Sequence, residues 1–355
     1  MQSYSIKIYL PFILLIVFAQ VNAQNPNRPQ TPKEPFNYNI EEVEYDNADK
    51  TIHYGATLTI PKNLKKFPIA IIISGSGSQD RNGTLLGHQP YWVLADYLSN
   101  NGVAVLRVDD RGTGKTTKGA NPKKITSLDL SFDVENSLNY LLQRKDIKQN
   151  EIGLIGHSEG GIIAPMVAAR RKEIKYLVLW GAPVIGGAIT NTNQNLLALR
   201  KAGIDSNATV AFGKLHLSIL ENFTENDTAL FKLKIDSTYK QWTRQQDAKI
   251  LKALYANEQF IVGQNVNAMY KQLYDINWMR YFINYNSKVD LEQVKCRVLA
   301  MIGEKDTQVD ADTNLALTEA ILKESGNKRV VIKKMASLNH LFQTATTGDV
   351  LDKLD

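Results

Sequence analysis

Residues 152–163 read Ile-Gly-Leu-Ile-Gly-His-Ser-Glu-Gly-Gly-Ile-Ile, an apolar run that passes through Gly-x-Ser-x-Gly into a helical pattern. A chain that turns this sharply from strand to helix has room only for glycine two residues before and after the serine, at Gly156 and Gly160. Such a turn holds the hydroxyl of Ser158 out over the end of a sheet. We therefore predict a nucleophile elbow at Ser158. The alternative is an ordinary glycine-rich turn with an inert serine.

Buried strands alternate with helices around this stretch. Continuous apolar runs rich in β-branched residues are typical of strands buried on both faces, and helical patterns such as Val134, Leu138 and Leu141 lie between them. This order predicts an α/β fold with a mostly parallel, doubly wound sheet, which binds ligands at the carboxyl ends of its strands. The predicted buried strands are residues 69–73, 103–108, 174–180, 297–302 and 328–333, with an antiparallel edge hairpin at 41–45 and 51–60.

The alternation stops between residues 188 and 290, where the sequence is polar and helical in pattern. We predict a helical cap insertion over the site here, between core parts at 41–187 and 291–355, with a disordered leader at 24–40. The aromatic side chains of the insertion either line an acyl or aryl pocket or form the insertion's own core. They are Trp242, Tyr255, Phe260, Tyr270, Tyr274, Trp278, Tyr281 and Phe282.

A serine hydroxyl becomes a useful nucleophile only beside a base and a group that orients that base. His340 follows the last predicted strand, at the edge where Ser158 lies, and is the predicted base. Asp306 follows the strand before it and is the predicted orienting acid, which gives the chain order Ser, Asp, His. Asp310 and Asp312 are close rivals for this role.

The other four of the five histidines are weaker candidates for the base. His53 lies in the edge hairpin and His216 in the insertion. His157 neighbours the serine, but a tight turn is expected to point its side chain elsewhere. His88 follows the first central strand, and a place in the lining of the site stays open for it.

The loop Ser-Gly-Ser-Gly-Ser at 74–78 follows the first central strand. A glycine-rich loop at this place supplies a second N–H group for a tetrahedral oxyanion. We predict an oxyanion hole made by the backbone N–H groups of Glu159 and Ser76; the alternative is a flexible loop.

Further along, Asp110 or Arg111 is expected to pin the strand ends by charged hydrogen bonds.

Composition argues against several other classes of protein. The net charge of +6 comes from scattered Lys and Arg residues rather than a basic stripe, which disfavours nucleic-acid binding. Cys296 is the single cysteine, so neither an internal disulfide nor a thiolate metal cluster is expected. The acids at 306–312 lack the spacing of a calcium loop. Gly-Lys-Thr at 114–116 is no phosphate loop, because Asp109 stands where the first glycine belongs.

These motifs together resemble the α/β-hydrolase superfamily, in particular bacterial serine esterases related to dienelactone hydrolases and serine aminopeptidase-type hydrolases. The resemblance implies an α/β-hydrolase fold, a nucleophile at Ser158, a base at His340, an acid at Asp306, and an oxyanion hole at Glu159 and Ser76. Our hypothesis is a serine hydrolase that acts on a small-molecule ester substrate, and we expect no cofactor or metal. The matching stretches are residues 74–83, 110–114, 156–161, 303–306 with Val309, and 339–340.

The resemblance has two departures and leaves rivals open. Ser74 stands where many relatives have histidine, and only fifteen residues follow His340, where relatives carry one more helix, so we expect a missing helix or an incomplete chain. The rivals are an acyltransferase, a binding protein with a dead triad, and a peptidase. A peptidase needs a group that holds a peptide terminus, and the candidates are Glu221, Glu225 and Glu258.

Residues 1–23 have the pattern of a secretory signal peptide. Lys7 is the only charge, residues 8–19 are almost wholly apolar, and Val-Asn-Ala at 21–23 is a small-residue cleavage pattern. The apolar run is shorter than a membrane-spanning helix requires. We therefore expect an exported protein, periplasmic or extracellular, without a stable membrane anchor.

Cleavage between Ala23 and Gln24 is the expected outcome of export, because signal peptidase recognises small residues at this spacing. Intact mass spectrometry of the protein recovered outside the cytoplasm measures this directly. A mature chain that begins at Met1 would contradict the prediction.

Overall fold

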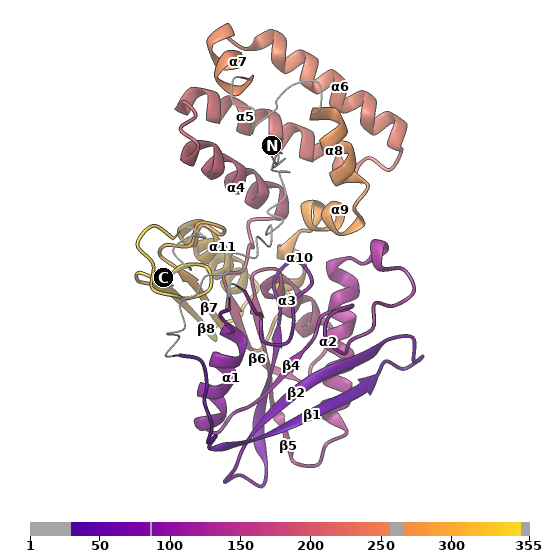
Figure 1. Cartoon of the computed structure of the whole chain (residues 1–355), viewed down its shortest axis with the longest axis vertical. Coiled ribbons are helices and arrows are strands. Elements are labelled where there is room, and N and C mark those ends of the chain that lie inside the picture. The colour runs from indigo at the N-terminus through magenta and orange to yellow at the C-terminus, as the bar shows by residue number, and fades with distance from the viewer. Residues whose placement is uncertain (1–29, 86, 256–265, 349–355) are drawn as a thin grey trace, which may run out of the picture. The chain divides into compact units, whose positions relative to one another are not determined.

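The computed structural model describes residues 30–85, 87–255 and 266–348, which form two compact units (Figure 1). Residues 186–285 make up one unit, and the described residues before and after them make up the other, which contains the sheet. The predicted signal peptide and the last seven residues lie outside the described part of the chain. No helix within that part is long and apolar enough to cross a membrane.

The sheet has eight strands in the order β1-β2-β4-β3-β5-β6-β7-β8. β1 and β2 pair antiparallel, β2 pairs antiparallel with β4, and every later pairing is parallel. The predicted α/β class, with its mostly parallel sheet and antiparallel edge hairpin, is therefore confirmed. The strands are β1 (Tyr38–Asp46), β2 (His53–Pro61), β3 (Phe67–Ile73), β4 (Ala104–Val108), β5 (Ile147–His157), β6 (Ile174–Trp180), β7 (Arg297–Gly303) and β8 (Val330–Met335).

β1 begins at Tyr38, three residues before the predicted start of the hairpin at 41. Tyr38 is buried, and the ring of Phe36 stacks on it with 5.2 Å between the ring centroids. The Tyr38 hydroxyl donates a hydrogen bond to Asp96. The stacking on Phe36 and the hydrogen bond to Asp96 hold the start of the strand at Tyr38. The alternation of polar and apolar residues in the sequence did not indicate these contacts.

Helices cover both faces of the sheet. Side chains alternate along a strand, so Ile69 and Ile71 of β3 enter the larger core, while Ala70 and Ile72 pack with α1. α2, α3, α10 and α11 contribute to the larger core. The helices of this unit are α1 (Pro90–Asn100), the 3-10 turn η1 (Pro122–Lys124), α2 (Ser127–Leu142), α3 (Gly160–Arg170), α10 (Ser287–Leu291) and α11 (Ala311–Glu324).

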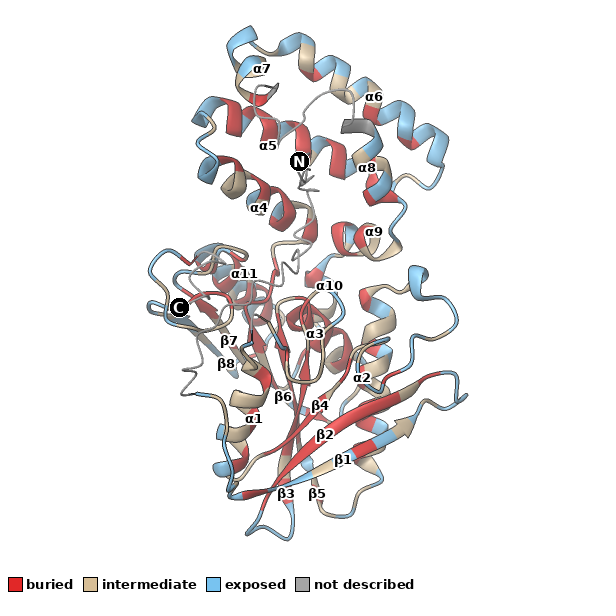
Figure 2. Ribbon diagram, in the orientation of Figure 1, coloured by how far each residue is buried: buried red, intermediate tan, exposed pale blue. Residues whose placement is uncertain are grey.

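The helical insertion has a hydrophobic core of its own, seen as buried faces along its helices in Figure 2. Trp242, Tyr270 and Tyr274 belong to this core, and Tyr274 stacks on Phe231 with 3.8 Å between the ring centroids. These aromatic residues therefore hold the insertion together. Phe260 and the side chain of Tyr255 lie outside the described residues. The insertion contains α4 (Gly187–Lys201), α5 (Ser206–Leu220), η2 (Glu221–Thr224), α6 (Thr228–Gln245), α7 (Ala248–Tyr255), α8 (Val266–Tyr274) and α9 (Asn277–Asn284).

Leu106→Ala in β4 is expected to lower the free energy of unfolding by about 2–5 kcal/mol, because it leaves a cavity around a side chain that has no exposed surface. Val331→Ala in β8 is the matched control: this side chain is half exposed, and the expected change is within about 0.5 kcal/mol. Urea unfolding measures both. Equal losses would show that the sheet core lies elsewhere.

Candidate active site

The turn between β5 and α3 has the geometry expected of a nucleophile elbow. Ser158 has a φ of 53°, in the left-handed region that non-glycine residues rarely adopt. A Cβ at Gly156 would collide with the carbonyl oxygen of Gly160, and a Cβ at Gly160 would collide with that of Ile73. The backbone N–H of Ser158 donates to the carbonyl of Trp180 at 2.7 Å. Steric exclusion and this hydrogen bond together fix the serine at the carboxyl end of β5.

His340 and Asp306 form a buried pair. His340 Nδ1 lies 2.7 Å from Asp306 Oδ2, and the exposed fractions of the two side chains are 6% and 0%. Asp306 Oδ1 accepts the backbone N–H groups of Gln308 and Val309 at 2.8 and 2.9 Å. An ionised carboxylate only accepts hydrogen bonds, so Nδ1 carries the proton, and Nε2 of the neutral ring is the atom that can accept one.

The two rival acids have other partners. Asp310 caps the N-terminus of α11, where its Oδ1 accepts the backbone N–H of Thr313 at 2.8 Å. Asp312 is exposed and binds Lys334 Nζ at 2.9 Å. The sequence left three acids open as partners of His340. In the structure, Asp306 is the acid that contacts His340.

The backbone of Ser158 and the imidazole of His340 are both placed at the carboxyl end of β6 (Ile174–Trp180). Ser158 is bonded to the backbone of Trp180, and the next residue, Gly181, lies against the imidazole. A Cβ at Gly181 would lie 3.0 Å from His340 Cε1 and 3.5 Å from Asp306 Oδ2. Gly181 has a φ of 61°, so both its backbone and its surroundings favour glycine.

Asp110 holds the loop at 74–79 in place. Its Oδ1 accepts the hydroxyl of Ser74 at 2.6 Å, and its Oδ2 accepts the backbone N–H of Gln79 at 2.8 Å. Gly75 in this loop faces the elbow, since a Cβ on it would lie 3.1 Å from Ser158 Cβ. The predicted oxyanion residue Ser76 follows directly. The predicted pinning role of Asp110 is confirmed.

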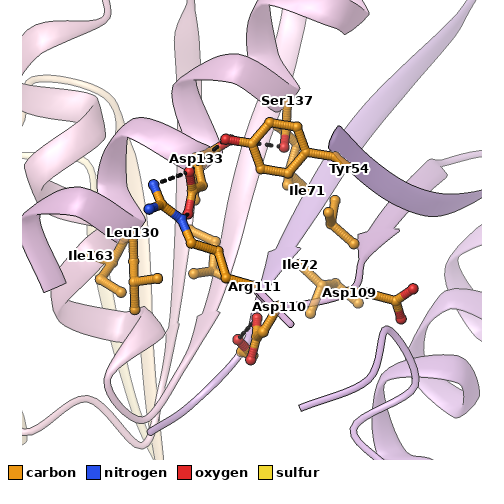
Figure 3. Close-up of a pocket in the computed structure, with 14 residues that line it drawn as sticks. Tyr54, Ile71, Ile72, Asp109, Asp110, Arg111, Leu130, Asp133, Ser137 and Ile163 are labelled. Atoms are coloured by element: carbon orange, nitrogen blue, oxygen red, sulfur yellow. Dashed lines mark hydrogen bonds and ion pairs between the residues drawn. The ribbon is translucent and has the colours of Figure 1, made fainter. Parts of the chain in front are cut away.

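A pocket of about 50 Å³ is lined by residues at the ends of β3 and β4 and by residues of α2 (Figure 3). Its lining includes Asp110, Arg111 and Asp133, and Arg111 donates to both carboxylate oxygens of Asp133 at 2.6 and 2.7 Å. Burial raises the pKa of Asp110 to about 7, and the nearby charges of Glu159 and Asp133 add to the rise. The loop is therefore anchored on a carboxyl group that titrates near neutrality.

The remaining histidines lie in different surroundings. His53 binds Asp46 and Glu44 on the edge hairpin. His88 lies 3.4 Å from the side-chain nitrogen of Gln30. His216 is in the insertion, and burial lowers its pKa to about 3.

His157 is the site residue that the sequence analysis missed. Its ring does not point away from the site, because it lies 4.8 Å from the ring of His340 between centroids. Its Nε2 lies 3.2 Å from the carbonyl oxygen of His340, and its Nδ1 lies 3.0 Å from the hydroxyl of Tyr91. The available signal was its place as the last residue of β5, because a side chain there stands at the carboxyl edge of the sheet.

Comparisons with known proteins identify the family. Residues 88–343 match the family described as serine aminopeptidase, S33 (Hydrolase_4), and this match spans most of the chain. The chain belongs to this family of α/β hydrolases. The predicted superfamily and fold are thereby confirmed.

Curated relatives match over shorter stretches. Esterase EstD of Thermotoga maritima is 27% identical over 135 residues, which are 38% of this chain and 32% of EstD. Dipeptidyl peptidase 8 of Homo sapiens is 30% identical over 124 residues, which are 34% of this chain and 14% of that protein. The chain thus matches a third or less of the length of these relatives.

A solved esterase structure from Pyrococcus furiosus has the same fold. It superimposes with a TM-score of 0.52 at 16% sequence identity, over 86% of this chain and 84% of that chain. At this identity the likeness concerns the fold alone.

Asp110→Asn is expected to change the pH dependence of stability. The pKa of Asp110 is raised in the folded protein, so the folded state binds the proton more tightly, and the stability that this group contributes falls as the pH rises from about 4 to about 7. Asparagine does not titrate. The free energy of unfolding of wild type should therefore fall relative to the variant, on the order of 1 kcal/mol per pH unit. Urea unfolding at pH 5, 6 and 8 tests this, and a constant difference would contradict it.

Proposed function

We propose that this hydrolase is an exported serine esterase that cleaves small-molecule carboxylic esters, with Ser158, His340 and Asp306 as its catalytic triad. The observation that carries the proposal is the buried 2.7 Å pair of His340 and Asp306 at the strand edge where Ser158 adopts its left-handed turn. Acyl transfer requires an oriented imidazole whose Nε2 can accept a proton, and a serine held at the same edge of the sheet.

The proposed reaction has two halves. His340 Nε2 takes the proton of Ser158 Oγ as the oxygen attacks the ester carbonyl carbon, and the resulting oxyanion binds the N–H groups of Glu159 and Ser76. The tetrahedral intermediate collapses, the C–O bond to the alcohol breaks, and the alcohol leaves with the proton from His340. Water then attacks the acyl-enzyme while His340 accepts its proton. The second tetrahedral intermediate collapses and the bond between Ser158 Oγ and the acyl carbon breaks. His340 returns its proton to Oγ, and the acid product leaves.

Asp306 has a separate part in this scheme. Its carboxylate keeps the proton on His340 Nδ1, so the correct tautomer faces the serine, and it stabilises the imidazolium that forms in each half-reaction. Its second oxygen is held by two backbone N–H groups, so the carboxylate has little freedom to leave the histidine.

The choice of esters over peptides rests on two supports. The match to esterase EstD favours ester substrates, although it covers only part of either chain.

A peptidase would need a charged group for a peptide terminus. Of the candidates, Glu225 binds Lys234 at 2.7 Å, Glu221 is exposed, and Glu258 lies outside the described residues. The family description and the match to dipeptidyl peptidase 8 keep peptide substrates as the alternative.

The proposed export rests on the signal-peptide pattern of residues 1–23.

Ser158→Ala is expected to lower kcat on p-nitrophenyl esters at least about a thousandfold, because it removes the nucleophile and leaves only binding and the oxyanion hole. Ser237→Ala, an exposed serine of α6, is the matched control and should retain wild-type rates. Hydrolysis of an ester chain-length series measures both, and the best chain length gives the size of the acyl site.

A parallel panel of aminoacyl and dipeptidyl anilides separates the two substrate classes. Faster Ser158-dependent turnover of anilides than of esters would replace the esterase proposal with a peptidase. Wild-type rates in Ser158→Ala would exclude the triad altogether.

A further inference from the structure

A buried chain of hydrogen bonds joins the loop at 74–79 to the segment that carries His340. Its members are Tyr91 of α1 and His157 of β5, and Trp180 of β6 bonds the same carbonyl oxygen as His157. Each of the three residues is at most 5% exposed. None of these side chains takes part in the proton transfers proposed above. They come from three elements that are distant in sequence, and their ring planes contact one another.

One end of the chain holds the backbone of the proposed base. The carbonyl oxygen of His340 accepts the indole N–H of Trp180 at 3.1 Å, and His157 Nε2 lies 3.2 Å from the same oxygen. A carbonyl oxygen only accepts hydrogen bonds, so His157 Nε2 must carry a hydrogen. Two rigid aromatic donors on one carbonyl leave the backbone of His340 little freedom to shift.

The other end holds the proposed oxyanion loop. The hydroxyl oxygen of Tyr91 accepts the backbone N–H of Gly75 at 3.3 Å, its proton is donated to Gln79 Oε1 at 2.9 Å, and His157 Nδ1 lies 3.0 Å from the same oxygen. Gln79 Nε2 donates to the carbonyl of Ser76 at 3.3 Å, which orients the amide. Burial raises the pKa of Tyr91, so the group remains a neutral phenol that can donate and accept.

We propose that His157 and Tyr91 are positioning residues for the esterase reaction, which set the backbone of His340 at a fixed place relative to the oxyanion loop. This inference rests on the proposed function. The proton acceptor His340 and the oxyanion donor Ser76 lie on separate loops, yet both must contact oxygens bound to the same tetrahedral carbon in one transition state. A misplacement of about 1 Å between such groups costs about a hundredfold in rate. The chain Gly75–Tyr91–His157–His340 directly links the two loops.

Tyr91→Phe is the sharpest test, because it removes one oxygen from the middle of the link and keeps the ring. We expect kcat to fall about 10- to 100-fold while KM stays within about threefold, since the geometry of the transition state is lost and ground-state binding is not. Tyr176→Phe is the matched control. Its hydroxyl donates to the carbonyl of Ile69 at 3.0 Å in the same sheet, so it is also a phenol that donates a hydrogen bond, and among the described residues it bonds a strand rather than either loop.

Two variants of His157 test the other half of the link. His157→Phe removes both hydrogen bonds, and His157→Gln retains a side-chain N–H that can reach the carbonyl of His340. We expect His157→Phe to lose about 10- to 100-fold in kcat, and His157→Gln to recover part of that loss. Titration of Ser158 with a fluorophosphonate gives kcat per reactive serine, and urea unfolding gives stability. Damage confined to folding would lower the number of reactive serines and leave kcat per serine unchanged.

The outcomes separate the two proposals. Loss of kcat per reactive serine in Tyr91→Phe, with Tyr176→Phe at the wild-type value, supports the positioning role. Equal kcat in the two variants, or equal kcat in His157→Phe and wild type, overturns that role and leaves the esterase proposal standing. Wild-type protein without Ser158-dependent turnover overturns the proposed function and the inference with it.

Discussion

The hydrogen bond from the backbone N–H of Ser158 to the carbonyl of Trp180 ties the elbow to the neighbouring strand. It forms at the last ladder position of two parallel strands, where the chain of β5 must leave the sheet. The indole of the same Trp180 donates to the backbone of His340. One residue thus bonds both the turn that exposes the proposed nucleophile and the segment that carries the proposed base. Its backbone position follows from strand pairing, and its side-chain position follows from close packing between strand ends.

The loop at 74–79 is held by hydrogen bonds to the buried carboxyl group of Asp110, and desolvation of the charged form of this group costs free energy. Asp110 accepts two hydrogen bonds from the loop, yet desolvation outweighs them and raises its pKa to about 7. The stability that such a carboxyl group contributes is lost as the pH rises from about 4 to about 7. Enzymes often lose folding stability at their active sites. Strained or poorly solvated groups are tolerated there because function requires their geometry.

The two compact units of the described chain have separate hydrophobic cores. The sheet unit places every residue of the proposed triad and of the positioning chain on its own elements. The helical insertion is held by aromatic packing among its own helices, as in the stack of Phe231 on Tyr274. The residues proposed for chemistry therefore all belong to the unit that contains the sheet.

The amino-acid sequence alone determined the class of the fold, the turn at Ser158, and the places of Asp306 and His340 after successive strands. These features are local: periodicity, glycine spacing and strand order are written along the chain. The tertiary structure alone decided that Asp306, rather than Asp310 or Asp312, pairs with His340, and that His157 binds the backbone of the base. Such contacts depend on side-chain directions and on distances between segments up to 183 residues apart, and these are set only when the strands pair and the helices pack.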